Sequence, residues 1–250
     1  MRPASEYMCG ATAMCLVAAC TSRRQRDRVE LVRGDTALPL RITSTNALAA
    51  LWLLPRLPQF RSLFPGIGLS IMGTDRVLDL EGGEVDIALR YARQPPDGLT
   101  ATEVARDSYI VVASPSLVGD GSGMFDPRAL AGLPLIDAQW SREFKNPPMW
   151  REWCRLARDH YGDVPDLTRS ISMSFLEDLH GIEAAIAGQG VALCSDLLVA
   201  GALARGELRQ ISPLRFPGYS VYAAHRPGDP RLAEIAIFEG WIASAFGAGL

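Results

Sequence analysis

Short apolar strands alternate with helix-forming segments between residues 40 and 89, and this order constrains the fold more than any other feature of the chain. Strands are expected at 40–43, 67–72 and 85–89. The intervening helices are expected at 47–54, continuing over 60–64, and at 76–81. Connections this short require parallel strands joined by right-handed crossovers. The segment therefore predicts an α/β fold built on an open, largely parallel sheet.

Prolines, glycines and capping residues mark where the elements end. Pro55 and Pro58 should interrupt the first helix, because proline lacks the backbone donor and crowds the preceding turn. Gly188 suits a left-handed helix C-terminus, and Asp196 is expected to cap the next helix. Further strands are expected at 109–113, 133–136, 171–174, 190–194 and 219–223, and further helices at 150–160, 175–187, 197–205 and 231–246.

Polar residues follow the predicted strands at the sheet edge where ligands of such folds collect. Ser44, Thr45, Gly73 and Thr74 fall at these carboxyl ends, beside helix N-termini that present free N–H groups, and Arg90 ends the third strand. Hydroxyls, free N–H groups and a guanidinium suit a small polar or anionic ligand. An alternative reading stays open for each of these residues. The hydroxyl groups could be ordinary helix caps, and Arg90 could form a structural salt bridge with Asp86 or Asp107. Asp86 itself is expected to be structural.

The tryptophans divide into two groups by their sequence context. Trp52, Trp153 and Trp241 stand at helical spacing among apolar residues, which indicates core packing. Trp140 and Trp150 flank an irregular segment and could line a cleft. For the first group, core packing is therefore preferred to an aromatic stacking site.

Composition excludes several classes of protein. The net charge of −3 argues against a chain coated in nucleic acid, and no apolar run is long enough for a membrane span. Five cysteines without a C-x-x-C pair indicate reduced thiols and a cytoplasmic location. Isolated histidines predict no metal site, and the sequence predicts no cofactor. The absence of nucleophile-elbow, phosphate-loop and zinc-protease motifs argues against an enzyme.

Residues 1–38 differ from the rest and are interpreted as an irregular leader. A small apolar stretch at 8–20 precedes a basic stretch at 21–28. A lipoprotein signal ending at Cys20 is the alternative, although Glu6 and the broken apolar run are unusual for one.

An ordered series of short motifs carries a family resemblance over residues 38–246. The series comprises Leu53-Leu-Pro-Arg-Leu57 with Phe60 and Pro65, Asp79 to Arg90, Val112-Ala-Ser-Pro115, Ala184 to Leu193, and Phe238-x-x-Trp241. Together these motifs resemble the effector-binding domain of LysR-type transcriptional regulators, in the subgroup that includes the glycine-cleavage activator.

The resemblance implies a fold like that of type 2 periplasmic binding proteins, with two α/β subdomains joined by two crossover strands. Subdomain I would span 39–113 plus 219–250, and subdomain II would span 114–218. It also implies that Ser114 at the crossover, with Ser172, Met173 and Ser174 in subdomain II, joins the ligand site.

The function implied is that of a small-molecule sensor with no chemistry of its own, which dimerises or tetramerises. Family members bind promoter DNA through an N-terminal helix-turn-helix, for which residues 1–38 are too short. The alternative is an exported solute-binding lipoprotein of the same fold.

Overall fold

The computed structural model describes residues 38–80, 82–121, 123–138 and 149–247. The predictions for the leader, for the lipid-bearing cysteine at position 20 and for Trp140 lie outside these residues. Within them, no helix is both long and apolar enough to cross a bilayer.

Eight strands form one mixed sheet in the order β2-β1-β3-β8-β4-β7-β5-β6. At one end, β1 (Leu40–Ser44), β2 (Leu69–Gly73) and β3 (Ile87–Ala92) run parallel, and we call them the first strand group. At the other end, β5 (Leu135–Ala138), β6 (Ile171–Phe175) and β7 (Val191–Ser195) also run parallel and form the second strand group. The prediction of an α/β fold with parallel strands is confirmed.

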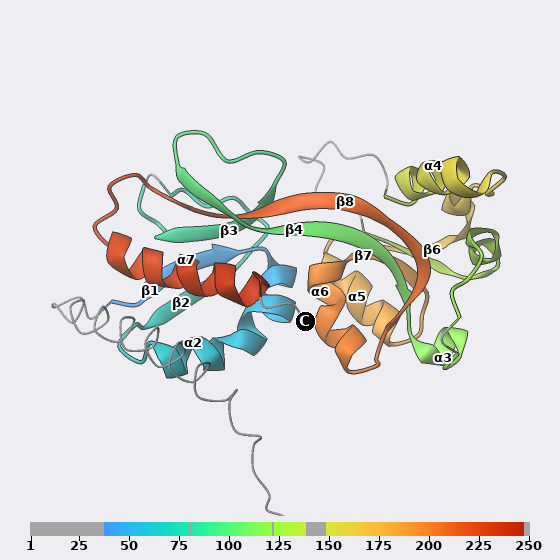
Figure 1. Ribbon diagram of the computed structural model, residues 1–250, viewed down its shortest axis with the longest axis horizontal. Coiled ribbons are helices and arrows are strands. Elements are labelled where there is room, and N and C mark those ends of the chain that lie inside the picture. Colours follow the sequence, from blue (N-terminus) through green and yellow to red (C-terminus); the bar gives the residue numbers. More distant parts are fainter. Residues whose placement is uncertain (1–37, 81, 122, 139–148, 248–250) are drawn as a thin grey trace, which may run out of the picture.

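Two long antiparallel strands join the groups: β4 (Thr100–Ala113) and β8 (Arg209–His225). They run together across the molecule in Figure 1. β8 pairs with β3 through Ser220–Ala224, whereas β4 pairs with β7 through Tyr109–Val112. The expected strands at 109–113 and 219–223 are thus only parts of longer ones. The subdomain boundaries stay a prediction, and residue 218 lies inside β8.

The helix after β1 changes its winding at each proline. It begins as a π-helical segment, η1 (Leu48–Leu53), tightens to a 3₁₀ turn, η2 (Leu54–Arg56), and continues as α2 (Leu57–Leu63). The two prolines each stand in the first turn of a new segment, where the missing donor costs no hydrogen bond. The interruption expected from Pro55 and Pro58 is confirmed.

The helix expected at 76–81 is wrong, because Arg76–Leu80 run as turns and irregular backbone. The Arg90 guanidinium donates to the carbonyls of Thr74 and Arg76. A side chain from β3 therefore takes up the backbone acceptors that a helix would have used.

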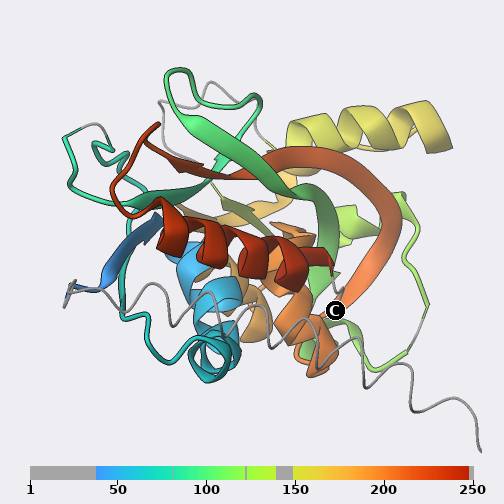
Figure 2. The same ribbon diagram turned by 60° about the vertical axis from the view of Figure 1, so that its left-hand side comes forward.

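The remaining helices pack on the two faces of the sheet, as Figures 1 and 2 show. The last helix, α7 (Leu232–Gly247), contacts β4, and α6 (Asp196–Ala204) contacts η1. The helices and 3₁₀ segments are α3 (Pro115–Val118), η3 (Pro127–Gly132), α4 (Met149–Tyr161), η4 (Leu167–Ser170), α5 (Asp178–Ile186), α6 (Asp196–Ala204) and α7 (Leu232–Gly247).

Two helix ends test the capping predictions. Gly188 has φ of 75° after α5 and donates to the carbonyl of Ala185, so its left-handed cap is confirmed. The cap of α6 is Ser195 rather than Asp196, because the Ser195 hydroxyl accepts from the Leu198 amide. Asp196 instead accepts from the hydroxyl of Ser108 at 2.6 Å.

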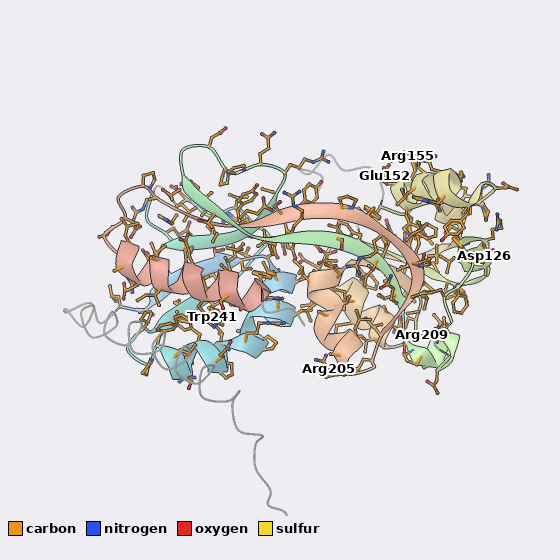
Figure 3. All side chains as sticks on the ribbon, in the orientation of Figure 1. Asp126, Glu152, Arg155, Arg205, Arg209 and Trp241 are labelled. Atoms are coloured by element: carbon orange, nitrogen blue, oxygen red, sulfur yellow. The ribbon has the colours of Figure 1, made fainter. Side chains whose placement is uncertain are left out.

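The larger core continues from the first strand group into the second. Trp52 and Trp241 are buried in it, and Figure 3 labels Trp241 on α7. The Trp241 indole donates to Gln59 of α2 at 3.3 Å. The same core includes Ile182 of α5 and Leu198 of α6, so side chains of both halves share one apolar interior.

A second core lies under α4 and holds the remaining tryptophans of the described chain. Trp150 and Trp153 are fully buried with ring centroids 5.9 Å apart. The prediction that Trp150 lines a cleft is wrong. Its side chain is fully buried, and its indole N–H donates to the buried carbonyl of Ile136 at 2.7 Å. The core assignment of Trp52, Trp153 and Trp241 is confirmed.

Candidate functional site

A cavity of about 500 Å³ lies beyond the carboxyl ends of the first strand group. Its volume is in the range of small-molecule sites. Residues after β6 and at the start of α5 complete it, so both halves of the molecule contribute. Its lining consists of Thr43, Thr45, Ala47, Asp75, Val77, Leu78, Leu80, Ala88, Arg90, Tyr91, Ala92, Pro96, Leu99, Leu176, Glu177, Asp178, Tyr222 and Ala224.

Arg90 holds three chain segments together at the cavity wall. Its guanidinium donates to the carbonyl of Thr74 at 2.5 Å, to the hydroxyl of Thr43 at 2.7 Å and to the carbonyl of Arg76 at 3.0 Å. The planar fork of five donors suits this task, because the three acceptors lie in different directions. The suggested pairing with Asp86 or Asp107 is wrong, because backbone carbonyls and a hydroxyl take up the guanidinium.

Asp86 is structural, as predicted. It is 2% exposed and pairs with Arg41 at 2.6 Å and with Arg231 at 3.2 Å. It also accepts from the Arg41 amide. Burial acts to raise the pKa of this carboxyl, but the hydrogen bonds and charge of Arg41, with the charge of Arg231, outweigh it and hold the pKa below its usual value.

Two carboxyl groups meet where the halves of the molecule approach each other. Asn46 donates from one amide nitrogen to Asp75 at 2.9 Å and to Glu177 at 3.4 Å. Asp75 follows β2, and Glu177 precedes α5. Burial, followed by the hydrogen bond and charge of Glu177, raises the pKa of Asp75 to about 6. The raised pKa indicates that the negative charge of Asp75 and Glu177 is not fully balanced by a nearby cation.

The structure brings together the predicted residues of the first strand group. Thr45 and Arg90 line the cavity, and the Thr45 hydroxyl also accepts from the Leu48 amide. Thr74 donates its amide to the carbonyl of Ser44 at 2.8 Å, which joins the ends of β1 and β2. Ser44 is fully buried, and its hydroxyl has no partner in the described part of the chain. A side chain at Gly73 would crowd Asn46.

Ser44, Gly73 and Thr74 do not belong to the cavity lining, and the four predicted residues beyond the first strand group also lie outside it. Ser114 caps α3 and contacts the Ser116 hydroxyl at 2.9 Å. On β6, the Ser172 hydroxyl donates to the carbonyl of Leu135, Met173 packs against the larger core, and Ser174 pairs with Asp137. Their role in binding a ligand remains a prediction.

Sequence reasoning missed the acidic and apolar parts of the wall. Asp75, Glu177 and Asp178 supply carboxyl groups, and Val77 and Leu176 supply exposed apolar side chains. Glu177 and Asp178 follow a predicted strand, as Ser44 and Thr45 do, so the same strand-end argument could have found them. Among the residues that the structure describes, no three His, Cys, Asp or Glu side chains form a metal-binding group.

Comparison with known proteins identifies the family. Residues 33–247 match the model of the LysR substrate binding domain. The chain belongs to this family. Its members are transcriptional regulators rather than enzymes. The relatives include activators, a repressor and further regulators rather than lipoproteins.

The relatives include the subgroup that the sequence motifs indicated. The glycine cleavage system transcriptional activator of Escherichia coli is 26% identical over 204 residues, which are 81% of this chain and 63% of that protein. The AhcY transcriptional activator HvrB of Rhodobacter capsulatus is 29% identical over 215 residues, 85% of this chain and 68% of that protein. This chain thus spans less than two thirds of the E. coli activator.

Solved structures confirm the fold. The effector domain of the transcriptional regulator AmpR of Pseudomonas aeruginosa superposes with a TM-score of 0.67 at 22% identity, covering 84% of this chain and 96% of that one. CrgA of Neisseria meningitidis, a LysR-type regulator, gives a TM-score of 0.63 at 17% identity, covering 95% and 79%. The fold similar to type 2 periplasmic binding proteins, which the resemblance implied, is confirmed.

Proposed function

We propose that this domain binds a small-molecule effector in the cavity between the first strand group and the start of α5. The observation that supports this is the composition of the wall, which both halves of the molecule share. A ligand that contacts both halves stabilises the arrangement in which both contacts are made. Binding would therefore shift the population of arrangements of the two strand groups about β4 and β8.

In the intact protein this shift would regulate transcription. The relatives act as transcriptional activators and repressors, and we propose the same for the protein that contains this domain. Promoter contact would be made by a helix-turn-helix outside residues 38–247, within a cytoplasmic dimer or tetramer. The shift cannot exceed the difference in effector affinity between the two arrangements.

A blocked cavity tests the proposal. Ala92 lines the cavity at the end of β3, and Ala92→Trp would fill part of it. A thermal-shift screen with small metabolites should give ligands that stabilise the natural chain and lose about tenfold or more in affinity with the variant. Thr102→Trp, on an exposed position of β4 outside the lining, is the matched control and should bind normally. Equal stabilisation of both folded variants would contradict the proposal.

A further inference from the structure

Carboxyl groups outnumber cations in the cavity wall. Four charged residues line it: Asp75, Glu177, Asp178 and Arg90. Three N–H groups of Arg90 are already donated to protein acceptors, which leaves little of its fork for an anionic ligand. At neutral pH the wall therefore attracts positive charge. This balance differs from the polar or anionic effector that the sequence suggested.

The start of α5 does not reverse this balance. A helix N-terminus carries partial positive charge that favours anions. Here Glu177 holds the N-cap position and Asp178 lies in the first turn, so two acidic residues of the chain itself already stand at that end. An anionic ligand at the same place would meet both.

The rest of the wall is apolar. Ten of the eighteen lining residues are Ala, Val, Leu or Pro. Val77 from the segment after β2 and Leu176 from the segment after β6 are each 74% exposed although they line the cavity. Removing exposed apolar side chains from water is favourable, so an organic ligand gains affinity by lying between them.

We propose that this cavity selects a small organic cation, an amine whose ammonium group lies between the carboxyl groups of Asp75 and Glu177 and whose apolar part covers Val77 and Leu176. This inference rests on the proposed effector site. An ammonium group has three donors and a full charge, whereas the Asn46 amide bridges the two carboxyl groups without neutralising them. A bare metal ion is disfavoured because the three lining carboxyl groups do not form a metal-binding cluster.

The titration of Asp75 predicts a pH dependence of binding. The pKa of Asp75 is raised to about 6, so as the pH falls through 6 this carboxyl takes up a proton and competes with the ammonium group. The charged and polar groups facing it are Glu177 before α5, Asn46 after β1 and Arg90 on β3. Amine binding should therefore weaken at acidic pH, while binding of a neutral analogue should not change.

Matched probes of one size test the charge class. Pentylamine, pentan-1-ol and pentanoate share an apolar chain, and phenethylamine with phenylacetate forms a second pair. Calorimetry at about pH 7.5 and about pH 5 should show amines binding about tenfold more tightly than the acids, with several-fold weaker amine binding at the lower pH. Asp75→Asn with Glu177→Gln should abolish the preference, whereas Glu207→Gln, in an exposed ion pair with Arg205, should keep it.

Two outcomes overturn the inference and separate it from the proposed function. In the first outcome, the acids bind as tightly as the amines, or none of the metabolites whose binding is lost in Ala92→Trp is a cation. The inferred charge of the ligand is then wrong, but the effector site stands. If Ala92→Trp leaves amine binding intact, the amines bind elsewhere and both proposals fail at this cavity.

Discussion

A single buried carboxyl on β4 makes the stability of this protein depend on pH. Asp107 is 2% exposed, and one of its oxygens accepts from the Ser195 hydroxyl at 2.9 Å. The other oxygen has no hydrogen-bond partner in the described residues. Burial, together with nearby Asp196 and against the Ser195 bond, raises the pKa of Asp107 to about 8. The folded protein therefore keeps a proton that the unfolded chain releases near pH 4.

The sign of this effect gives the first prediction. Between about pH 4 and pH 8 the folded state binds more protons than the unfolded state, so the free energy of unfolding should fall as the pH rises through that window. Asp107→Asn mimics the protonated carboxyl and should raise that free energy by about 2–4 kcal/mol at pH 8 and flatten the slope. Urea denaturation from pH 5 to 8 measures this.

Asp97→Asn is the control for this titration, because Asp97 is exposed. It should leave the pH dependence unchanged. A loss of stability in Asp107→Asn at every pH would show instead that the ionised carboxylate is required at this position.

At the scale of the element, Arg90 determines the course of the segment after β2. It takes up the carbonyls of Thr74 and Arg76, so Arg90→Lys should release Arg76–Leu80 and destabilise the fold by about 1–3 kcal/mol. Hydrogen exchange followed by mass spectrometry should show faster exchange in residues 74–80. Arg61→Lys, at an exposed position of α2, should show no change. If residues 74–80 of Arg90→Lys exchange as slowly as those of the natural chain, the Arg90 guanidinium does not hold this segment.

The same contact explains why this segment does not form the helix that its local sequence favours. Capping residues and apolar spacing favour a helix at 76–81, whereas the deciding donor comes from a residue fourteen positions after Arg76. Local periodicity did predict the parallel strands and the positions of Thr45 and Arg90, because those depend on neighbouring residues. It shortened β4 and β8, because register shifts, the partly exposed first half of β4 and the partly exposed middle of β8 break the apolar pattern.

The contact between Glu177 and the first strand group lay beyond local reasoning for a similar cause. Glu177 meets Asn46 across 131 positions of the chain. Nothing near either residue encodes that meeting, which arises only once β4 and β8 set the two strand groups beside each other. The strand-end positions of Thr45 and Arg90 were therefore predictable, and the pairing between the halves was not.

At the scale of the whole molecule, the shared core predicts cooperative unfolding in spite of the two strand groups. Leu198 of α6 is 4% exposed and belongs to the same cluster as Trp52 of η1. The helices that carry them, α6 and η1, are in contact. Neither half can lose this interior without exposing apolar side chains of the other, so the halves should unfold together although the cavity between them can change shape.

Leu198→Ala tests this coupling. The cavity it leaves should cost about 2–4 kcal/mol, and hydrogen exchange should accelerate equally in β2 and β6, the strands at opposite edges of the sheet. Leu63→Ala, at a position 40% exposed, should change neither strand. If exchange accelerates in β6 alone, the second strand group unfolds by itself. Effector binding would then act by ordering one half rather than by shifting the arrangement of two stable ones.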